Sequence, residues 1–288
     1  GAITIPSKLL SEIVNKLPNE TPVSIEVEEN LDTILIKSDR GSFNLKGIPS
    51  DDYPSLPFVE SGTSLNIDPS SFLKSLKSTI FASSNDDSKQ LLTGVNFTFK
   101  QNYLESASTD GHRLAVALIG NKENTDDNTN LSSDDSDLSV TIPTRSLREI
   151  EKLLSLKSSE SSIKLFYDKG QVVFISSNQI ITTRTLEGTY PNYSQLIPDT
   201  FSKILNFNTK KLIDALERIA VLADQQSSVV KIKLDATDDT DLALISADAQ
   251  DIGNANESIP VSYSGENFDI AFNVRYLLEG LKVIASEN

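Results

Sequence analysis

The sequence is poor in several residue types that carry chemistry. Its 288 residues include no cysteine, no methionine, no tryptophan and a single histidine, His112. Without cysteine there can be no disulfide, no thiolate nucleophile and no zinc–thiolate site, and a cytosolic location is favoured. One histidine cannot build a multi-histidine site, so we expect no metal. No apolar run approaches the roughly 20 residues that span a bilayer, so we expect no membrane association.

Catalytic and nucleotide-binding motifs are missing as well. The chain has no Walker A sequence and no GxGxxG, GxSxG, HExxH or EF-hand pattern. A Ser-His-Asp triad around His112 can be drawn, but no serine carries the elbow signature, so a hydrolase has no supporting motif. We therefore expect no catalytic residue and no cofactor. The chain starts at Gly1 and runs directly into a strand-like stretch, which indicates a piece of a longer protein or a processed one.

An internal repeat is the main feature that is present. AITIPSKLLSEIVNKL at 2–17 matches SVTIPTRSLREIEKLL at 139–154. SLNIDPSSFLKSLKSTIFASS at 64–84 matches ILNFNTKKLIDALERIAVLAD at 204–224. Each unit reads as a strand, a helix with apolar residues at i, i+3, i+4 and i+7, and about three short strands. The pattern predicts an α+β fold.

The two kinds of repeat alternate, so one of each makes a domain. This predicts the second half of a first domain over 1–62, a complete middle domain over 63–199, and an incomplete third domain over 200–288. The polar, acidic stretch 122–139 has no apolar periodicity. It is predicted to be a solvated loop that joins the two halves of the middle domain.

The charge of the chain is unevenly distributed. The net charge of −15, taken whole, argues against nucleic acid. The five predicted helices carry 13 of the 26 Lys and Arg but only 9 of the 41 Asp and Glu, which leaves them at +4 and the remaining chain at −19. These helices are 6–17, 68–84, 143–157, 208–224 and 274–287.

Basic residues recur on the outer faces of these helices. One such face is typical of any solvated helix, but recurrence in each repeat favours a shared surface for a phosphate backbone, without base readout. The residues are Lys74, Lys77, Arg145, Arg148, Lys152, Lys211, Arg218, Arg275 and Lys282.

Several stretches together resemble a known family. TDGHRLAV at 109–116, LLTGVNFTF at 91–99 and EGTYPNYSQLIP at 187–198 closely resemble the bacterial beta sliding clamp, the processivity subunit of DNA polymerase III. SADAQ at 246–250 and FNVRYLLEGLK at 272–282 resemble its third domain, and the long acidic stretch resembles cyanobacterial members.

The resemblance implies a DNA-clamp fold and a non-enzymatic function. Two chains would close head to tail into a ring, with helices lining the hole and sheets outside, and the homodimer would encircle duplex DNA without sequence preference. Lys89 joins the DNA-facing residues on this basis. The dimer contact would involve the strand around Lys37 to Lys46 and, in the third domain, Val221 and Leu222. A clamp-like peptide-binding scaffold that does not encircle DNA is the alternative.

The resemblance also implies a role for His112 in binding. The polymerase catalytic subunit, the clamp loader and repair proteins would insert a QLxLF-type peptide into a pocket of the middle domain, for which apolar side chains supply walls. The implied pocket consists of Leu92, Thr109, Gly111, His112, Arg113, Leu114, Pro191 and Leu196. Gln195 stands where many relatives have Arg, which puts one polar peptide contact in doubt. By the same resemblance, Asn288 lies before the family's C-terminal strand, which completes this pocket, and Gly1 lies after the first half of its first domain.

Overall fold

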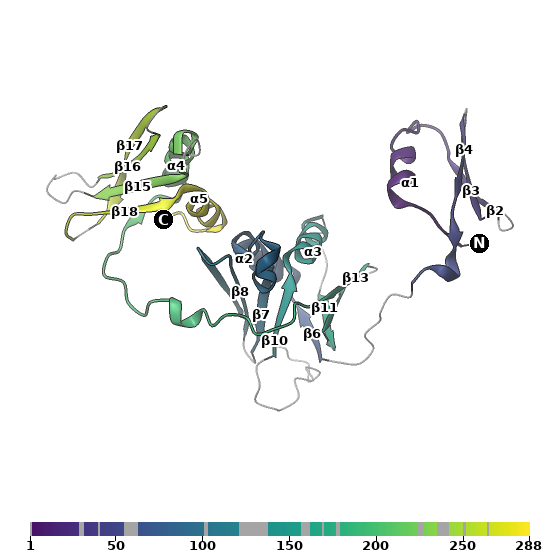
Figure 1. The fold of residues 1–288 in the computed structure, drawn as a ribbon, viewed down its shortest axis with the longest axis horizontal. Helices are drawn as coiled ribbons and strands as arrows, with labels where there is room; N and C mark the ends of the chain where they lie inside the picture. The colour runs from purple at the N-terminus through teal and green to yellow at the C-terminus, as the bar shows by residue number, and fades with distance from the viewer. Residues whose placement is uncertain are drawn as a thin grey trace. The chain divides into compact units, whose positions relative to one another are not determined.

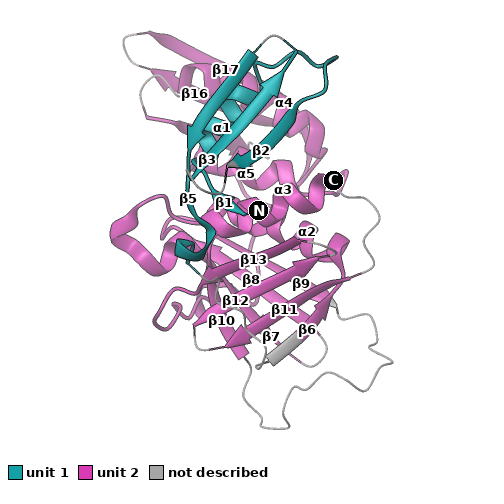
Figure 2. Ribbon diagram, turned by 90° about the vertical axis from the view of Figure 1, so that its right-hand side faces the viewer, with its two compact units in different colours: residues 1–58 teal, residues 59–288 magenta. Residues whose placement is uncertain are grey.

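The computed structural model divides into two compact units, residues 1–58 and 59–288 (Figure 2). It describes residues 2–28, 32–39, 41–54, 63–100, 103–120, 138–156, 162–168, 170–176, 179–223, 227–234, 242–249, 252–263 and 265–288. Most of the predicted acidic loop and the residues just before the predicted boundary at 62 lie outside these ranges.

The first unit packs one helix on a small antiparallel sheet. The sheet has the order β2-β3-β4, and a separate pair joins β1 to β5. Alternate residues of β3, Ile34 and Ile36, are buried against Leu10 and Ile13 of α1. The elements are β1 (Ile3–Thr4), α1 (Ser7–Val14), β2 (Ser24–Glu28), β3 (Thr33–Ser38), β4 (Gly41–Lys46), β5 (Ile48–Pro49) and the 3-10 turn η1 (Ser50–Asp52).

The second unit begins with two four-stranded antiparallel sheets that share one core. Their strand orders are β10-β7-β8-β9 and β13-β12-β11-β6. The strands are β6 (Thr63–Ile67), β7 (Gly94–Phe99), β8 (Tyr103–Thr109), β9 (Leu114–Gly120), β10 (Leu138–Pro143), β11 (Ile163–Asp168), β12 (Gln171–Ser176) and β13 (Gln179–Arg184).

These two sheets exchange their first strands. β10 opens the second half but pairs with β7 of the first half, where Val140 lies opposite Phe97. β6 opens the first half but pairs with β11 of the second, where Leu65 lies opposite Leu165. The predicted repeat of strand, helix and three strands is confirmed, and with it the α+β class.

Helices α2 (Pro69–Thr79) and α3 (Thr144–Leu156) cover the two sheets and lie side by side (Figure 1). The ring of Phe72 on α2 lies 5.7 Å from the ring of Phe97 in the first sheet and 5.9 Å from that of Phe174 in the second. The apolar face of each helix therefore holds both sheets in one core. Short 3-10 turns follow at η2 (Ile80–Ala82) and η3 (Asp87–Thr93).

The last part of the second unit repeats this plan around a five-stranded sheet of order β14-β17-β16-β15-β18. Leu212, Leu216 and Ile219 of α4 are buried against Ile232 and Ile245 of the sheet. The elements are the 3-10 turn η4 (Ser194–Leu196), β14 (Asn206–Phe207), α4 (Thr209–Ala223), β15 (Val229–Leu234), β16 (Leu242–Ala249), β17 (Gly253–Ser262), β18 (Phe268–Asn273) and α5 (Val274–Val283).

The predicted helices are found, but some end early. The helix predicted over 274–287 ends at Val283, because Ile284 turns to an extended conformation (φ −75°, ψ 122°). The carbonyl of Glu287 then accepts from the Thr209 amide at 2.9 Å, so this tail holds the start of α4 instead of extending α5. The helix predicted over 68–84 gives way after Thr79 to η2.

Candidate functional site

The turn between β8 and β9 contains His112 and is held by its own polar groups. The Asp110 Oδ1 atom accepts from the amides of His112 at 2.8 Å and Arg113 at 3.1 Å. The Thr109 hydroxyl donates to the Arg113 carbonyl at 2.6 Å and accepts from the Gly111 amide at 3.0 Å. Gly111 has a φ of +94°, a conformation in which other residues are strained. The turn is therefore a fixed support that leaves His112 exposed.

The Arg113 guanidinium ties this turn to two other segments. Its Nε donates to Asp110 Oδ2 at 3.1 Å, and its Nη2 donates to the carbonyl of Phe81 at 2.6 Å. Its Nη1 forms an ion pair with Glu279 of α5. The guanidinium carbon lies 4.4 Å from the centre of the Tyr276 ring, and only 16% of the side chain is exposed. The family resemblance implied that Arg113 belongs to the peptide pocket, and in the structure its guanidinium donates to partners within the chain.

Tyr276 extends the site in a way that the sequence did not indicate. Its ring lies 6.4 Å from the imidazole of His112, at an interplanar angle of 21°. Asn273 caps α5 by accepting from the amides of Arg275 at 3.0 Å and Tyr276 at 3.3 Å, which fixes Tyr276 in the first turn. An N-cap Asn followed by an aromatic residue three positions later was the available signal, but its neighbours lie far away in the sequence.

The segment after β13 borders the same turn. The hydroxyl of Tyr190 accepts from the Thr109 amide at 3.1 Å, and burial raises the pKa of Tyr190 to about 12. The hydroxyl of Tyr193 donates to Glu105 of β8, and burial, followed by that carboxylate, raises the pKa of Tyr193 well above its ordinary value. Pro191 lies between these tyrosines and is exposed, and Leu196 is 73% exposed.

The other predicted pocket residues come from neighbouring segments. Leu92 is half-buried in η3, and Leu114 is half-buried at the start of β9, directly opposite Thr109. Lys89 in η3 was placed with the DNA-facing residues, but its ammonium donates to the Asp110 carbonyl at 3.3 Å, at the turn. Of the predicted pocket residues, Thr109, Gly111 and Arg113 are joined by hydrogen bonds within the turn. Lys89, which was not predicted to belong to the pocket, is bonded to the same turn.

A hollow of about 1080 Å³ opens on the helical side of the second unit. It is lined by α2, η2, α3 and the end of α5, and Phe81, whose carbonyl binds Arg113, is among its walls. Five of the ten predicted DNA-facing residues line it, against one acidic residue, Glu151. The five are Lys74, Lys77, Arg148, Lys152 and Lys282.

The remaining basic candidates lie elsewhere. Arg145, Lys211 and Arg275 are exposed on α3, α4 and α5. Arg218 makes a double hydrogen bond to Glu257 of β17, at 3.0 Å from Nε and 2.5 Å from Nη2. This bond holds the pKa of Glu257 below its ordinary value, so part of the Arg218 charge is already compensated.

Ion pairs also engage two cations of the hollow. Lys152 lies 2.8 Å from Glu149, and Lys282 lies 2.6 Å from Glu217. Both pairs are largely exposed, so they compensate the charge only weakly in water. The hollow is therefore a broad basic surface and not a set of buried charges.

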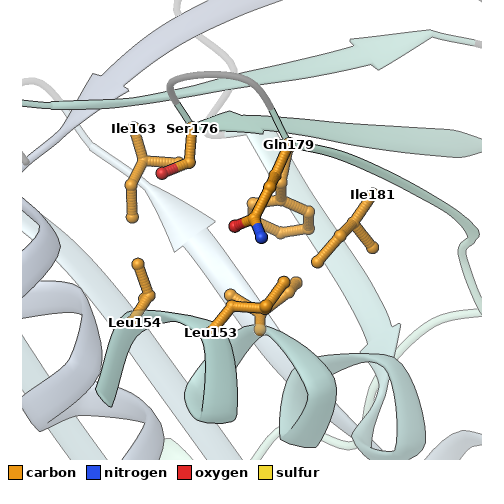
Figure 3. A pocket seen from close by; sticks show the side chains of 8 residues that line it. Leu153, Leu154, Ile163, Ser176, Gln179 and Ile181 are labelled. Carbon is orange, nitrogen blue, oxygen red and sulfur yellow. The ribbon is translucent and has the colours of Figure 1, made fainter. Parts of the chain in front are cut away.

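A second cavity is unrelated to these surfaces. Between α3 and the strands β11 to β13, Leu153, Leu154 and Ile181 surround a cavity of about 20 Å³ (Figure 3). It has room for about one water molecule, so it is a packing defect of the core and not a ligand site.

The predicted dimer residues fall in both units. Lys37 on β3 forms an ion pair with Glu26 at 3.0 Å, and Lys46 ends β4. Val221 is 67% exposed in the last turn of α4, and Leu222 beside it is half-buried. Across the described residues no group of three or more His, Cys, Asp or Glu could hold a metal ion, and no described helix is long and apolar enough to cross a membrane.

Known proteins share this architecture over the full chain. Three family models of the DNA polymerase III beta subunit match this chain. The model of the N-terminal domain matches residues 1–57, that of the central domain residues 66–192, and that of the C-terminal domain residues 194–288. The beta sliding clamp of Synechococcus elongatus is 43% identical over 99% of this chain and 72% of its own length. The beta sliding clamp of Bacillus subtilis is 34% identical over 99% of this chain and 71% of its own length.

Solved structures agree. The DNA polymerase sliding clamp from Bacillus subtilis has a TM-score of 0.86 at 32% identity, covering 100% of this chain and 72% of its own. A DnaN sliding clamp from Pseudomonas aeruginosa bound to griselimycin has a TM-score of 0.85 at 26% identity, covering 100% and 73%. These similarities define the class as ring-clamp subunits of a replicative polymerase. The chain belongs to the bacterial beta sliding clamp family, so the predicted family, fold and function as a DNA sliding clamp are confirmed.

Proposed function

We propose that the β8–β9 turn and the segments bonded to it form a binding site for short linear peptides of the QLxLF type. Such peptides would come from the polymerase catalytic subunit, the clamp loader and repair proteins. The observation that carries the proposal is the internal satisfaction of the turn's polar groups, since Asp110, Thr109 and Arg113 bond to one another. A rigid turn surrounded by apolar side chains favours an apolar ligand.

The apolar contacts would come from four half-buried or exposed side chains and one ring. Leu92, Leu114, Pro191 and Leu196 would contact the peptide's Leu and Phe anchors, with His112 stacked on Tyr276 as an amphipathic edge. Thr109 and Gly111 would shape the backbone beneath the peptide. Arg113 would act by fixing the turn, because its guanidinium is engaged by Asp110, Phe81 and Glu279.

The basic hollow supports the other half of the function, the contact with encircled duplex DNA. Lys74, Lys77 and Arg148 are exposed on the helices that line it, and Arg145, Lys211 and Arg275 would continue the surface. Exposed lysines and arginines that follow no base-reading motif suit diffuse phosphate contacts, which hold DNA without fixing its register. Lys152 and Lys282 would contribute as well, because their exposed ion pairs compensate the charge only weakly. Arg218 would contribute less, because it makes two hydrogen bonds to Glu257.

The assembly follows from family membership. Two chains would form the head-to-tail ring, with the strands around Lys37 and Lys46 of one chain against Val221 and Leu222 of its partner. The domains would be 1–62, 63–199 and 200–288, a division supported by the separate matches of the three family models. As a processivity factor acting on the chromosome, the protein would have no catalytic activity of its own and would be cytoplasmic.

The test is binding of a fluorescently labelled QLxLF-type peptide, followed by anisotropy. Wild-type protein should bind with micromolar affinity, and Leu114→Asp should abolish binding because it places a carboxylate against an apolar anchor. The matched control is Leu118→Asp, the same change on the same strand at a side chain that is 66% exposed. Equal loss in both variants, or none in Leu114→Asp, would refute the site. Peptide binding without retention on circular DNA by the loaded protein would favour the scaffold alternative.

A further inference from the structure

The segment from Tyr190 to Leu196 is attached to β8 by two tyrosine hydroxyls. Tyr190 accepts from the Thr109 amide at 3.1 Å, at the end of β8. Tyr193 donates to Glu105 in the middle of the same strand. The two rings meet edge to face, with centroids 6.4 Å apart. Tyr193 is buried and Tyr190 half-buried, although the residues around them are exposed.

The apolar residues of this segment have little packing of their own. Pro191 is exposed and Leu196 is 73% exposed, so burial in the core does not fix their positions. The short turn η4 is closed only locally, where the Leu196 amide donates to the Tyr193 carbonyl at 2.9 Å. That turn is anchored through Tyr193 itself. The positions of both apolar side chains therefore depend on the two phenols.

We propose that Tyr190 and Tyr193 are positioning residues of the peptide site: their hydroxyls hold the 190–196 segment against β8, so that Pro191 and Leu196 form a fixed apolar wall. This inference rests on the proposed peptide-binding function and extends it to two residues that do not touch the peptide's anchors. A wall fixed before binding saves the entropy of ordering it afterwards, so loss of a hydroxyl should weaken binding even though no contact with the peptide is removed.

The link to the turn is direct. The amide of Thr109 donates to Tyr190, while the hydroxyl of Thr109 bonds to Gly111 and to the Arg113 carbonyl. Thr109 also pairs with Leu114 across the ladder. The phenol of Tyr190 thus joins the apolar wall to the turn and, through Thr109, to Leu114 at the start of β9. This bond explains how the wall and the turn, more than 70 residues apart in the sequence, can stay at a fixed distance from each other.

The experiment measures the affinity of the labelled peptide for Tyr190→Phe and Tyr193→Phe. Each should bind roughly 3- to 10-fold more weakly, the range expected for one lost hydrogen bond. The matched control is Tyr263→Phe, which removes a hydroxyl that donates to the Glu266 carbonyl at 2.8 Å between β17 and β18. It should bind as the wild type does. The melting temperatures of the three variants should shift by similar amounts, which separates positioning from a general loss of stability.

A second background tests whether Tyr193 acts through Leu196. In Leu196→Ala, which is safe for folding because Leu196 is 73% exposed, adding Tyr193→Phe should cost less than 2-fold in affinity. Glu105→Gln keeps an acceptor for the Tyr193 hydroxyl and should bind better than Glu105→Ala. Full additivity of Leu196→Ala and Tyr193→Phe, or wild-type affinity in both phenylalanine variants, would overturn the inference. Failure of the wild-type protein to bind any peptide would refute the proposed function instead.

Discussion

The β8–β9 turn and the basic hollow share a wall at Phe81 but use their polar groups in opposite ways. In the turn, Asp110, Thr109 and Arg113 are bonded to one another, and Arg113 is 16% exposed. In the hollow, the charged ends of Lys74 and Lys77 lie in solvent. A site whose polar groups are internally satisfied selects by shape, whereas exposed like charges attract any phosphate backbone. The comparison shows how one unit can hold a specific partner and a non-specific one at adjacent surfaces.

The largest effect on the difference between the two surfaces is expected from removing the side chain of Arg113, which holds the β8–β9 turn. Arg113→Ala removes the partner of Asp110 Oδ2, of the Phe81 carbonyl and of the half-exposed Glu279. Asp110 Oδ1 keeps the two amides of the turn, but the buried charge of Asp110 loses its guanidinium. We expect the free energy of unfolding to fall by about 2–4 kcal/mol, as for breaking a buried charged pair. Urea denaturation measures it, with Arg184→Ala, an exposed position on β13, as the control that should change by less than about 0.5 kcal/mol. A loss as small as the control's would mean that the turn does not depend on this residue.

Charge reversal in the hollow should affect DNA alone. In the double variant Lys74→Glu with Lys77→Glu, two phosphate contacts are lost, and the slope of log K against log salt should become shallower by about 2. Affinity for duplex DNA, measured by titration at several salt concentrations, should fall about 10-fold or more at low salt, while peptide affinity stays unchanged. The same double change at Lys231 and Lys233, exposed on β15, provides the control. An equal loss in the control would mean that only net charge matters.

The smallest expected effect concerns alkaline pH. Burial raises the pKa of Tyr190 to about 12, above the ordinary value of 10 for an unfolded chain. The folded protein thus keeps a proton that the unfolded chain loses, so this contribution to stability is complete below pH 10 and disappears as the pH rises toward 12. Urea midpoints between pH 9 and 12 should fall less steeply in Tyr190→Phe than in wild type. Parallel curves would show that this phenol does not set the alkaline limit.

Local pattern in the sequence was enough to predict the elements. The apolar spacing predicted a helix over 143–157, which is found as α3. The short strands predicted after the helix at 208–224 include β15 and β16, in which buried and more exposed residues alternate. These features succeed because a helix or strand buries one face with a fixed period. Where the signal is not periodic, prediction failed. The turn η3 begins with two local bonds, in which Asp86 accepts from the Ser88 amide through its side chain and from the Lys89 amide through its carbonyl, each at 3.0 Å, and it was not predicted.

The sequence could indicate the candidate site only through its family resemblance. Arg113 bonds to Phe81, 32 residues away, and to Glu279, 166 residues away, and neither partner has a local signature. Tyr276 joins the site because α5 is brought beside α2 by the fold. The end of α5 at Val283 depends likewise on Glu287 bonding to Thr209, far earlier in the chain. Contacts of this range are properties of the packed unit and not of any short segment.

The exchange of first strands between the two halves has a consequence for folding kinetics. β6 begins the second unit, yet its partner β11 lies about 100 residues later, since Leu65 pairs with Leu165. Neither sheet is complete until both halves have been synthesised and have come together. The chain between the paired strands must therefore lose conformational entropy before those pairings can form. High contact order slows folding, so we expect this part of the chain to fold late and as one cooperative step during synthesis. A ribosome-bound chain that ends before β11 would leave β6 unpaired, an exposed edge that chaperones would have to protect.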